Sequence, residues 1–344
     1  MTFSIAVPVH NGEKFLELTL ASALNQKRPP DEIVALDDAS SDRSEQIIKS
    51  EKWGGRVMYL YNRTPSGYAD AWNRIVKHTH SDFVTILHQD DLLDPDYLFH
   101  IERALHAYPQ CRHIYAGYYY IDEYGNHTGA SPLPHSAVPE LIPGKEYANR
   151  YLGGVVTNRH IHRCPGVTTE RRLLLETCSY RKEAGLIADD DFFLRVGEFT
   201  DVIGISEPLA SFRSHSRSVT GQLKSISHTL ARDYLFQTQY YQSHTSMLNA
   251  SDIRLIHNQT VRFINDSLIE SFVKNNTWLN EEARMFRREF EDTVPDNFIG
   301  QSSAVARLLW MISKKILPGS TMGSILSTWL QILLFLKKNF STKI

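Results

Sequence analysis

Residues 83 to 96 read Phe-Val-Thr-Ile-Leu-His-Gln-Asp-Asp-Leu-Leu-Asp-Pro-Asp, an apolar strand pattern that runs directly into a cluster of carboxylates. The carboxyl end of a strand in an α/β sheet is where ligands bind. Oxygen-rich groups there can hold Mg²⁺ or Mn²⁺ together with the phosphates of a nucleotide. Asp94 and Asp96 are explained by a helix that begins near Tyr97, which they would cap. Asp90 and Asp91 have no such explanation and are candidate site residues.

The first 120 residues alternate between strand and helix patterns. Apolar runs of strand length lie at about 3–9, 32–37, 57–61, 82–87 and 113–121. Stretches with helical spacing lie between them, at about 13–26, 42–52, 67–79 and 96–107. This β-α-β-α order predicts an α/β fold, with a mostly parallel central sheet flanked by helices.

Length and charge divide the chain into two predicted parts. The 344 residues, 42% of them apolar, suffice for one large core and an appendage. We expect an α/β domain over residues 1–222 and a C-terminal helical region over 223–344. Residues 301–344 hold six Lys and Arg and no acid, so that a net charge of −2 leaves −8 for residues 1–300. An acidic body with a basic tail argues against a nucleic-acid partner.

The basic tail, about residues 304–340, contains two apolar patterns with helical spacing, at 304–317 and 323–336. At ~1.5 Å per residue the second spans roughly 21 Å, which is short of a ~30 Å hydrocarbon core. We expect these helices either to lie on an anionic membrane surface, with Lys337 and Lys338 at the headgroups, or to pack on the domain or at a dimer interface.

The amino terminus and the cysteines predict a cytoplasmic protein. Residues 1–9 carry no charged leader, and their apolar run is too short for a signal peptide. The three cysteines have no paired or metal-ligand spacing, which indicates a reducing compartment. The tail would make the protein peripheral on the inner face of the cell membrane.

The first two predicted strands end in polar segments. Strand one ends in Val-Pro-Val-His-Asn-Gly, residues 7–12, and not in a Gly-x-Gly-x-x-Gly or Gly-x-x-x-x-Gly-Lys loop. This argues against a dinucleotide-binding Rossmann enzyme and a P-loop ATPase. Strand two delivers Asp37 and Asp38, whose carboxylates can accept hydrogen bonds from a base or a ribose. Asp42 is expected to cap the next helix.

Three of these segments together resemble family 2 glycosyltransferases, which have the GT-A fold, invert the sugar and often act in bacterial surface-polysaccharide assembly. The motifs are Pro-Val-His-Asn-Gly at 8–12, Asp-Asp-Ala-Ser-Ser-Asp at 37–42 and His-Gln-Asp-Asp at 88–91. The resemblance covers about residues 2–220 and implies a nucleotide-diphospho-sugar donor, with UDP preferred. The nucleotide-binding residues it implies are Pro8, Val9, Asn11, Asp37, Asp38, Gly67, Asn73, His88 and Gln89.

The resemblance also implies a divalent metal, Mn²⁺ or Mg²⁺. The family's metal motif is Asp-x-Asp, and here His88 stands in the first position and Asp90 in the second. Asp90 is therefore the implied metal ligand. His88 is expected either to bind ribose or diphosphate or simply to end the strand. Its neutral ring predicts weaker metal binding than a second acid would give.

Residues 186–195, Leu-Ile-Ala-Asp-Asp-Asp-Phe-Phe-Leu-Arg, place three acids before an apolar helical face. Inverting sugar transfer needs a base that takes the proton of the acceptor hydroxyl. The resemblance makes Asp189 that base and Asp191 a second catalytic acid, while we expect Asp190 to face solvent. Crowded carboxylates are expected to raise a pKa toward a useful range. Acids favoured at a helix amino terminus are the alternative explanation.

A basic, hydroxyl-rich stretch follows at residues 212–220, Phe-Arg-Ser-His-Ser-Arg-Ser-Val-Thr. It resembles the family's Arg-x-His segment. This implies that Arg213, His215 and Arg217 contact the diphosphate and that His215 also completes the metal shell. A solvated basic loop is the alternative explanation.

These motifs predict a metal-dependent hexosyltransferase that passes a sugar from a UDP-sugar to a hydroxyl of a glycan or lipid-linked acceptor. A non-catalytic sugar-nucleotide-binding or scaffold protein of the same fold is the alternative. A sugar-nucleotide pyrophosphorylase would want a Gly-rich loop after strand one, which the sequence lacks. The donor sugar and the acceptor stay open, and an oligomer is compatible with the sequence.

Overall fold

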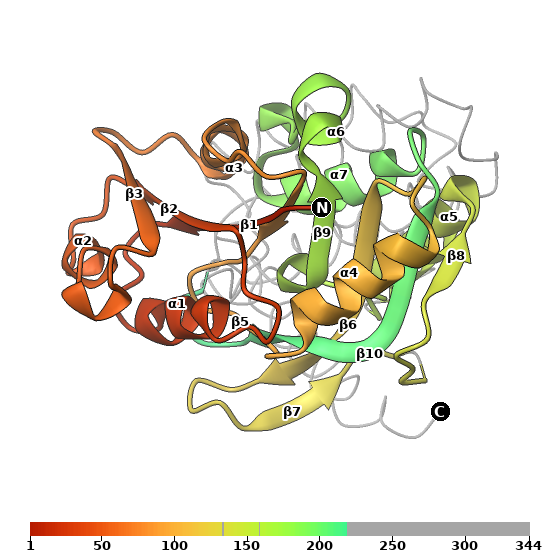
Figure 1. Cartoon of the computed structure of the whole chain (residues 1–344), viewed down its shortest axis with the longest axis horizontal. Helices are drawn as coiled ribbons and strands as arrows, with labels where there is room; N and C mark the ends of the chain where they lie inside the picture. Colours follow the sequence, from red (N-terminus) through yellow and green to blue (C-terminus); the bar gives the residue numbers. More distant parts are fainter. Residues whose placement is uncertain (133, 158, 219–344) are drawn as a thin grey trace, which may run out of the picture. The chain divides into compact units, whose positions relative to one another are not determined.

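A computed structural model describes residues 1–132, 134–157 and 159–218. In this part of the chain the strands form one mixed sheet in the order β3-β2-β1-β4-β9-β6-β10-β5, with β7 paired to β6 and β8 to β10 (Figure 1). The strands are β1 (Phe3–Val9), β2 (Glu32–Asp38), β3 (Val57–Asn62), β4 (Phe83–Ile86), β5 (Leu92–Leu93), β6 (His113–Ile121), β7 (His127–Ala130), β8 (Glu140–Ile142), β9 (Val167–Glu170) and β10 (Val202–Arg213).

Strand directions confirm the predicted α/β sheet. Strands β1 to β4 are parallel to one another, and β6 and β10 run in the same direction. Strand β9 lies between β4 and β6 and is antiparallel to both. The short strands β5 and β8 pair with β10, and β7 with β6, all antiparallel. The long strands therefore all end at one edge of the sheet.

Helices connect the strands. The α-helices are α1 (Leu16–Leu24), α2 (Ser44–Ile48), α3 (Tyr68–Lys77), α4 (Tyr97–Ala107), α5 (Gly144–Thr157), α6 (Arg171–Glu176) and α7 (Ala188–Val196). Short 3₁₀ helices are η1 (Glu51–Trp53), η2 (Cys164–Gly166) and η3 (Lys182–Ile187). The elements predicted in the first 121 residues are all present, with ends shifted by a few residues. The predictions for 223–344, the 304–340 tail included, lie outside the described residues.

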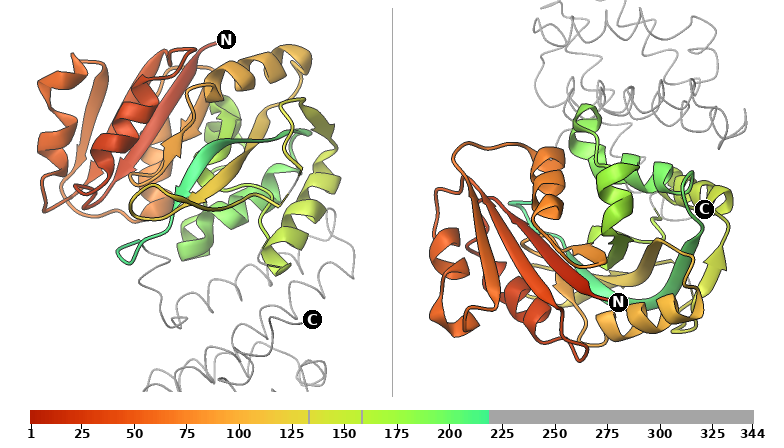
Figure 2. Two further views of the ribbon diagram at one scale, coloured as in Figure 1. Left: turned by 90° about the horizontal axis from the view of Figure 1, so that it is seen from below. Right: turned by 45° about the horizontal axis from the view of Figure 1, so that its top comes forward.

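The two faces of the sheet are covered by different helices. In β1, Phe3, Ile5 and Val7 alternate with side chains on the other face, and all three belong to a core shared with α1 and α4. Helices α1, α2 and α4 lie below the sheet in the right-hand view of Figure 2, and α3 and α6 lie above it. Consecutive crossovers therefore change face as the chain passes from β3 to β4.

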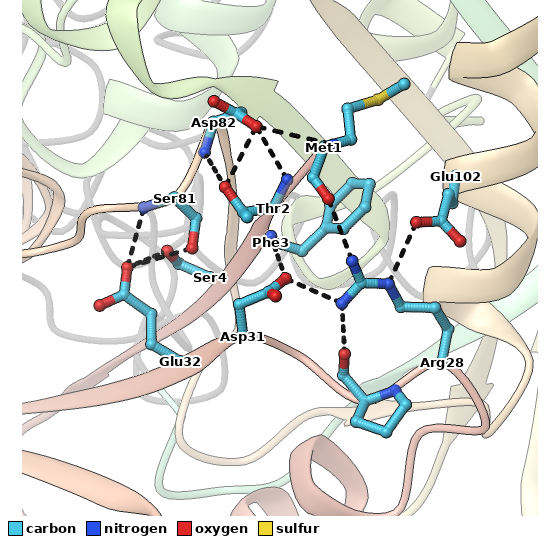
Figure 3. Close-up of polar contacts among 11 residues, drawn as sticks. Met1, Thr2, Phe3, Ser4, Arg28, Asp31, Glu32, Ser81, Asp82 and Glu102 are labelled. Atoms are coloured by element: carbon cyan, nitrogen blue, oxygen red, sulfur yellow. Dashed lines mark hydrogen bonds and ion pairs between the residues drawn. The ribbon is translucent and has the colours of Figure 1, made fainter.

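Polar contacts fasten the edge of the sheet where β1, β2 and β4 begin (Figure 3). The Thr2 N–H donates to Asp82 Oδ2 at 2.8 Å, and the Asp82 N–H donates back to Thr2 Oγ1 at 2.9 Å. Arg28 donates to Asp31 at 2.8 Å and to Glu102 at 3.2 Å, which links the start of β2 to α4. These contacts leave the opposite edge, where β1, β2 and β4 end, for ligand binding.

None of the helices in residues 1–132, 134–157 and 159–218 is both long and apolar enough to span a membrane. The predicted helix start at Tyr97 is confirmed. Just before it, Asp94 Oδ1 accepts the Asp96 N–H at 2.9 Å, while the Asp96 carboxylate pairs with Lys27 at 2.7 Å. Asp96 stands at the N-cap position without a side-chain capping hydrogen bond, and Asp94 bonds the chain ahead of the helix. The expectation that these two carboxylates cap the helix is therefore wrong.

Helices α5 and α7 are fixed to each other by a close backbone approach. A Cβ atom added at Gly144 would lie 2.0 Å from the Gly197 carbonyl oxygen, and one added at Gly197 would lie 2.3 Å from the Gly144 oxygen. The Gly144 N–H also donates to Asp201 Oδ1 at 3.0 Å. Only glycine fits at this crossing, so the start of α5 sets the position of the end of α7.

Gly144→Ala is expected to lower the free energy of unfolding by about 2 kcal/mol, because the added methyl group forces the two backbones apart. Gly153→Ala, in the same helix, is the matched control, since a Cβ there meets no atom of the described residues within 4 Å. That change is expected to stabilise the protein by about 0.5 to 1 kcal/mol. Urea unfolding measures both, and equal stability of the two variants would contradict the close approach.

Candidate active site

The predicted site residues gather at the edge where β1, β2 and β4 end. Strand β1 lies between β2 and β4, and the crossovers on its two sides use opposite faces of the sheet. Such a switch point opens a crevice outside the carboxyl ends of the strands. The segments 8–12, 37–42 and 88–91 all follow these strand ends. The topology thus brings the three sequence motifs to one place.

The loop after β1 is held by side-chain amides. The His10 N–H donates to Gln89 Oε1 at 2.7 Å, and Gln89 Nε2 donates to the His10 carbonyl at 3.0 Å. The Asn11 N–H donates to Ser40 Oγ at 2.9 Å, and Asn11 Oδ1 accepts the Ser41 N–H at 2.8 Å. Gln89 therefore joins the β1 and β4 loops, and Asn11 joins the β1 and β2 loops while remaining exposed.

Two adjacent acids at the end of β2 have different surroundings. Asp38 accepts from Asn62 Nδ2 at 2.5 Å and from the Ser66 N–H and hydroxyl at 2.9 to 3.0 Å, which fixes the loop before α3. Asp37 accepts only the Ser40 N–H, at 2.8 Å, among the hydrogen bonds of the described residues. Asp37 therefore keeps acceptor capacity for a ligand, whereas Asp38 is committed to the fold.

Some of the other residues predicted to contact the nucleotide make contacts within the fold. The Val9 side chain belongs to the core, and Pro8 is half-buried. Gly67, with φ of 84°, is exposed immediately before α3. Asn73 Nδ2 donates to the Tyr180 carbonyl at 2.7 Å, and its Oδ1 accepts the Tyr180 N–H at 3.1 Å. Asn73 thus connects α3 to the segment that leads to α7.

His88 is packed against an aromatic ring. It stacks on Trp72, with ring centroids 5.3 Å apart and an interplanar angle of 21°. Burial lowers the pKa of His88 against the opposing charge of Asp90, so the ring is neutral at neutral pH. Its Nε2 is buried without a hydrogen-bond partner in the described part of the chain. The ring is held in place, and one nitrogen stays available to a ligand.

The two residues predicted as metal ligands lie together. His215 Nε2 is 2.9 Å from Asp90 Oδ2, and the His215 ring contacts Phe15, with centroids 4.7 Å apart. No third His, Cys, Asp or Glu completes a metal-binding cluster within the described ranges. Mg²⁺ and similar ions commonly use one or two protein ligands and take the remaining oxygens from substrate phosphates and water. Asp90 and His215 fit that kind of site.

Arg213 fastens the end of β10 beneath this pair. Its N–H donates to Asp91 Oδ1 at 2.8 Å, its Nε to the Asp90 carbonyl at 2.8 Å and its Nη1 to the Asp122 carbonyl at 3.0 Å. Burial and the charge of Asp90 raise the pKa of Asp91 well above its usual range, against the opposing effect of Arg213. Arg213 is 2% exposed, so it supports the site from within, while Arg217 is exposed.

Asp191 is a buried anchor of helix α7. It is fully buried, and it accepts from Arg181 Nε and Arg195 Nε at 2.9 Å each. The Arg195 Nη2 also donates to the Ser179 carbonyl at 2.7 Å. Both guanidinium groups therefore enclose one carboxylate and tie α7 to the loop before it. The contacts of Asp191 are those of a structural residue that holds α7 in place, whereas the sequence predicts a catalytic acid at this position.

The expectation that Asp190 faces solvent is wrong. Asp190 is 9% exposed and accepts a hydrogen bond from the Tyr151 hydroxyl at 2.6 Å. His160 Nδ1 lies 4.0 Å from the same carboxylate oxygen. The reason is that α5 packs along this side of α7, so the side chain that a free helix would expose meets Tyr151 instead.

Asp189, the predicted base, is the half-buried member of the three. Burial and the charge of Asp190 raise the pKa of Asp189 to about 7, against the opposing charge of Arg163. A carboxyl with a pKa near neutrality can accept a proton at physiological pH. Burial and the charges of Asp189 and Asp91 also raise the pKa of Cys164. The ring of Trp72 contacts both His88 and Tyr180, and Tyr180 contacts Phe192 of α7, so a chain of aromatic contacts joins the loop after β4 to α7.

Three arginines were missed by the sequence reasoning. Asp191 and Arg195 have the i, i+4 spacing that pairs opposite charges on a helix, so the sequence alone could have predicted this ion pair. Arg181 and Arg163 come from segments without a helix or strand periodicity of their own, so nothing local predicted their contacts. Arg163 directly precedes η2 and lies over the Phe212 ring at 5.3 Å.

Sequence comparison assigns this part of the chain to a family. Residues 4–166 match the profile of Glycosyl transferase family 2. The segment is a family 2 glycosyltransferase domain. The match includes the motifs that follow β1, β2 and β4, and it stops before Asp189 and His215. The resemblance stated from the three motifs is therefore confirmed.

Curated relatives of the glycosyltransferase domain are bacterial. An uncharacterized glycosyltransferase of Rickettsia conorii is 31% identical over 124 residues, which are 36% of this chain and 20% of that protein. The putative teichuronic acid biosynthesis glycosyltransferase TuaG of Bacillus subtilis is 30% identical over 121 residues, 33% of this chain and 46% of that protein. The chain thus covers less than half the length of these relatives.

Solved structures with the same fold include TarS 1–349 of S. aureus, which was also crystallised with UDP-GlcNAc. Its TM-score is 0.60 at 16% identity, over 91% of this chain and 87% of that chain. The mannosyltransferase PcManGT of Pyrobaculum calidifontis, in complex with GDP-Man and Mn²⁺, has a TM-score of 0.51 at 14% identity, over 91% and 88% of the two chains. These likenesses confirm the GT-A fold of the glycosyltransferase domain.

Asp191→Asn is expected to lower the free energy of unfolding by about 3 to 5 kcal/mol, because it leaves the buried Arg195 and the half-buried Arg181 without their carboxylate. Asp189→Asn, two residues earlier in the same helix, is the matched comparison. At pH 8 it is expected to leave stability unchanged or to raise it, because the folded state disfavours the ionised Asp189. Urea unfolding of both variants at pH 8 measures the difference, and a larger loss for Asp189→Asn would contradict these roles.

Proposed function

We propose that the protein is an inverting glycosyltransferase that moves a sugar from a UDP-sugar to a hydroxyl group, with Asp189 as the general base. The observation that carries this proposal is the half-buried Asp189 carboxyl, whose raised pKa suits proton transfer at neutral pH. It stands on a helix that Asp191 and Asp190 fasten to the domain. The family match and the fold support a nucleotide-sugar donor.

The proposed reaction is a single displacement. Asp189 takes the proton of the acceptor hydroxyl as the hydroxyl oxygen bonds to the anomeric carbon. The bond from that carbon to the phosphate oxygen breaks on the opposite face, and its electron pair leaves with the nucleoside diphosphate. The sugar configuration is therefore inverted. The fixed position of α7 keeps the carboxylate oriented toward the reacting hydroxyl.

The donor is proposed to lie across the ends of β1, β2 and β4. Asn11 and the remaining acceptor capacity of Asp37 are suited to the base and ribose, and His88 Nε2 to a ribose or diphosphate group. Pro8, Val9, Asp38, Gly67, Asn73 and Gln89 would shape this region. Asp90 and His215 would hold Mn²⁺ or Mg²⁺, and Arg217 lies two residues beyond His215. The ion, when bound, supplies positive charge to the departing diphosphate.

The acceptor is proposed to be a glycan or a lipid-linked glycan. This rests on the basic tail at 304–340 and on the name of the relative TuaG, a putative teichuronic acid biosynthesis enzyme. We further propose that residues 1–222 form the catalytic domain and 223–344 a helical region that brings the cytoplasmic enzyme to the inner membrane surface.

Asp189→Asn is expected to lower kcat by about 10²- to 10⁴-fold while donor binding persists, because the amide cannot take the acceptor proton. Binding and hydrolysis or transfer would be measured with UDP-, GDP- and dTDP-sugars in Mn²⁺ and in EDTA. A UDP-sugar is expected to bind best, and EDTA to weaken its binding.

Asp90→Ala is the companion variant in this experiment, and it is expected to reproduce in Mn²⁺ the weak binding that the wild type shows in EDTA. Asp96→Ala, a surface ion-pair residue on the same loop, is the matched control and should bind donor normally. Donor binding without turnover in the wild type would favour the scaffold alternative. Turnover that survives Asp189→Asn would refute the assigned base.

The pH dependence of kcat should report Asp189. Its folded-state pKa of about 7 lies above the usual 3.8, so the carboxyl is protonated and inactive as a base below about pH 7. We expect kcat to fall about tenfold per pH unit on the acid side. Asp190→Asn keeps an acceptor for the Tyr151 hydroxyl but removes a charge that raises this pKa, so the acid limb should move to lower pH. An acid limb at pH 4 in the wild type would rule out this assignment.

A further inference from the structure

Arg163 is a half-buried cation that has no role in the proposed reaction. It lies between α5 and β9, directly before η2. Its guanidinium group lies 5.3 Å over the Phe212 ring, and its Nη2 donates to the Tyr120 hydroxyl at 3.5 Å, the long limit of a hydrogen bond. These two contacts hold the side chain at the ends of β6 and β10.

No acid in the described part of the chain pairs with the charge of Arg163 at close range. Its Nε is buried and has no hydrogen-bond partner among the described residues, and no carboxylate there comes within 4.0 Å of it. Arg213 in the same domain bonds through its side chain to the carbonyls of Asp90 and Asp122. A buried guanidinium N–H without a hydrogen-bond partner is costly to keep in a folded protein.

Arg163 acts on both acidic segments of the site. Its positive charge lowers the pKa of Asp189 and of Asp91, although burial is the larger effect on each and raises them. Burial and the same charge lower the pKa of His160 to about 4, so that ring is neutral. The His160 Nδ1 is also buried without a hydrogen-bond partner among the described residues. The His160 Nδ1 lies 4.0 Å from Asp190 Oδ1, so a second nitrogen without such a partner stands beside the acids of α7.

We propose that Arg163 binds an anionic oxygen of a substrate, a phosphate or a carboxylate, at the point where donor and acceptor meet. This inference rests on the proposed function, because it needs both substrates at Asp90 and Asp189. The planar fork of a guanidinium matches phosphate and carboxylate oxygens, and its Nε–H and an Nη–H can bond to one such group together. The two sources of the anion are the donor diphosphate and an acceptor that carries an acidic group.

The test compares wild type, Arg163→Gln, Arg163→Lys and the control Arg150→Gln. Arg150 is on α5 and pairs with Glu140 and Glu146 at the surface. In the first arm, UDP with Mn²⁺ is titrated into each protein by calorimetry. In the second arm, glycerol phosphate and glucuronate are titrated separately into protein saturated with UDP and Mn²⁺. Thermal unfolding of each variant verifies that it is folded.

Arg163→Gln is expected to weaken binding by about 10- to 100-fold in one arm, as for the loss of a hydrogen bond to a charged group. Loss in the first arm assigns the anion to the donor diphosphate, and loss only in the second assigns it to an acidic acceptor. Arg163→Lys should recover part of the affinity because it keeps the charge without the fork, and Arg150→Gln should bind like wild type.

If Arg163→Gln binds both UDP and the acidic ligands as tightly as wild type, the inference is overturned. If Arg163→Gln is unfolded, wild-type binding by Arg163→Lys in both arms overturns it. The outcome for the proposed function is separate. If wild type binds none of UDP, GDP and dTDP, the proposed function fails, and the second arm is then run without nucleotide. Arg163-dependent binding of either anion there would leave the Arg163 site standing, and its absence would overturn that site too.

Discussion

The buried carboxylate of Asp191, enclosed by Arg181 and Arg195, is the contact on which the geometry of helix α7 depends. The same Arg195 donates to the Ser179 carbonyl, and the next residue, Tyr180, is bonded through its backbone to Asn73. A continuous set of contacts therefore runs from α7 to α3. Helix α3 begins beside the edge of the sheet where β1, β2 and β4 end, so the proposed base and the proposed donor site share one rigid support.

Adjacent acids are used differently at each of the three acidic motifs. Asp38 is bonded to Asn62 and Ser66, whereas Asp37 retains acceptor capacity. A similar division occurs after β4, where Asp91 is buried against the Arg213 backbone and Asp90 meets His215. In α7, Asp190 and Asp191 accept hydrogen bonds from other residues of the domain, and Asp189 is half-buried. In each case one carboxylate stabilises the loop or helix that presents its neighbour.

This division explains what the sequence could predict. The apolar periodicity of residues 3–121 determined the elements of the parallel part of the sheet, because β1, β2 and β4 are almost continuous buried runs, while β3 at the edge of the sheet is partly exposed. The motifs at 8–12, 37–42 and 88–91 were sufficient for the family and for the location of the site.

The roles within each motif depended on contacts distant in sequence, such as Asn73 with Tyr180 or Tyr151 with Asp190, which no local pattern contains. Strands β7 to β9 and helix α5 were also beyond local reading, since the 122–183 segment is rich in Gly, Pro and Tyr.

The three side-chain and backbone bonds of Arg213 have a consequence for how ligands enter. Because Arg213 is fixed by groups in the loops that follow β4 and β6, the position of His215 two residues later is largely decided when the core folds. Ordering this segment then costs little free energy when a ligand binds, because few torsion angles lose their freedom on association. A donor bound as proposed should accordingly dock rapidly on a preorganised surface, with dissociation setting most differences in affinity among donors.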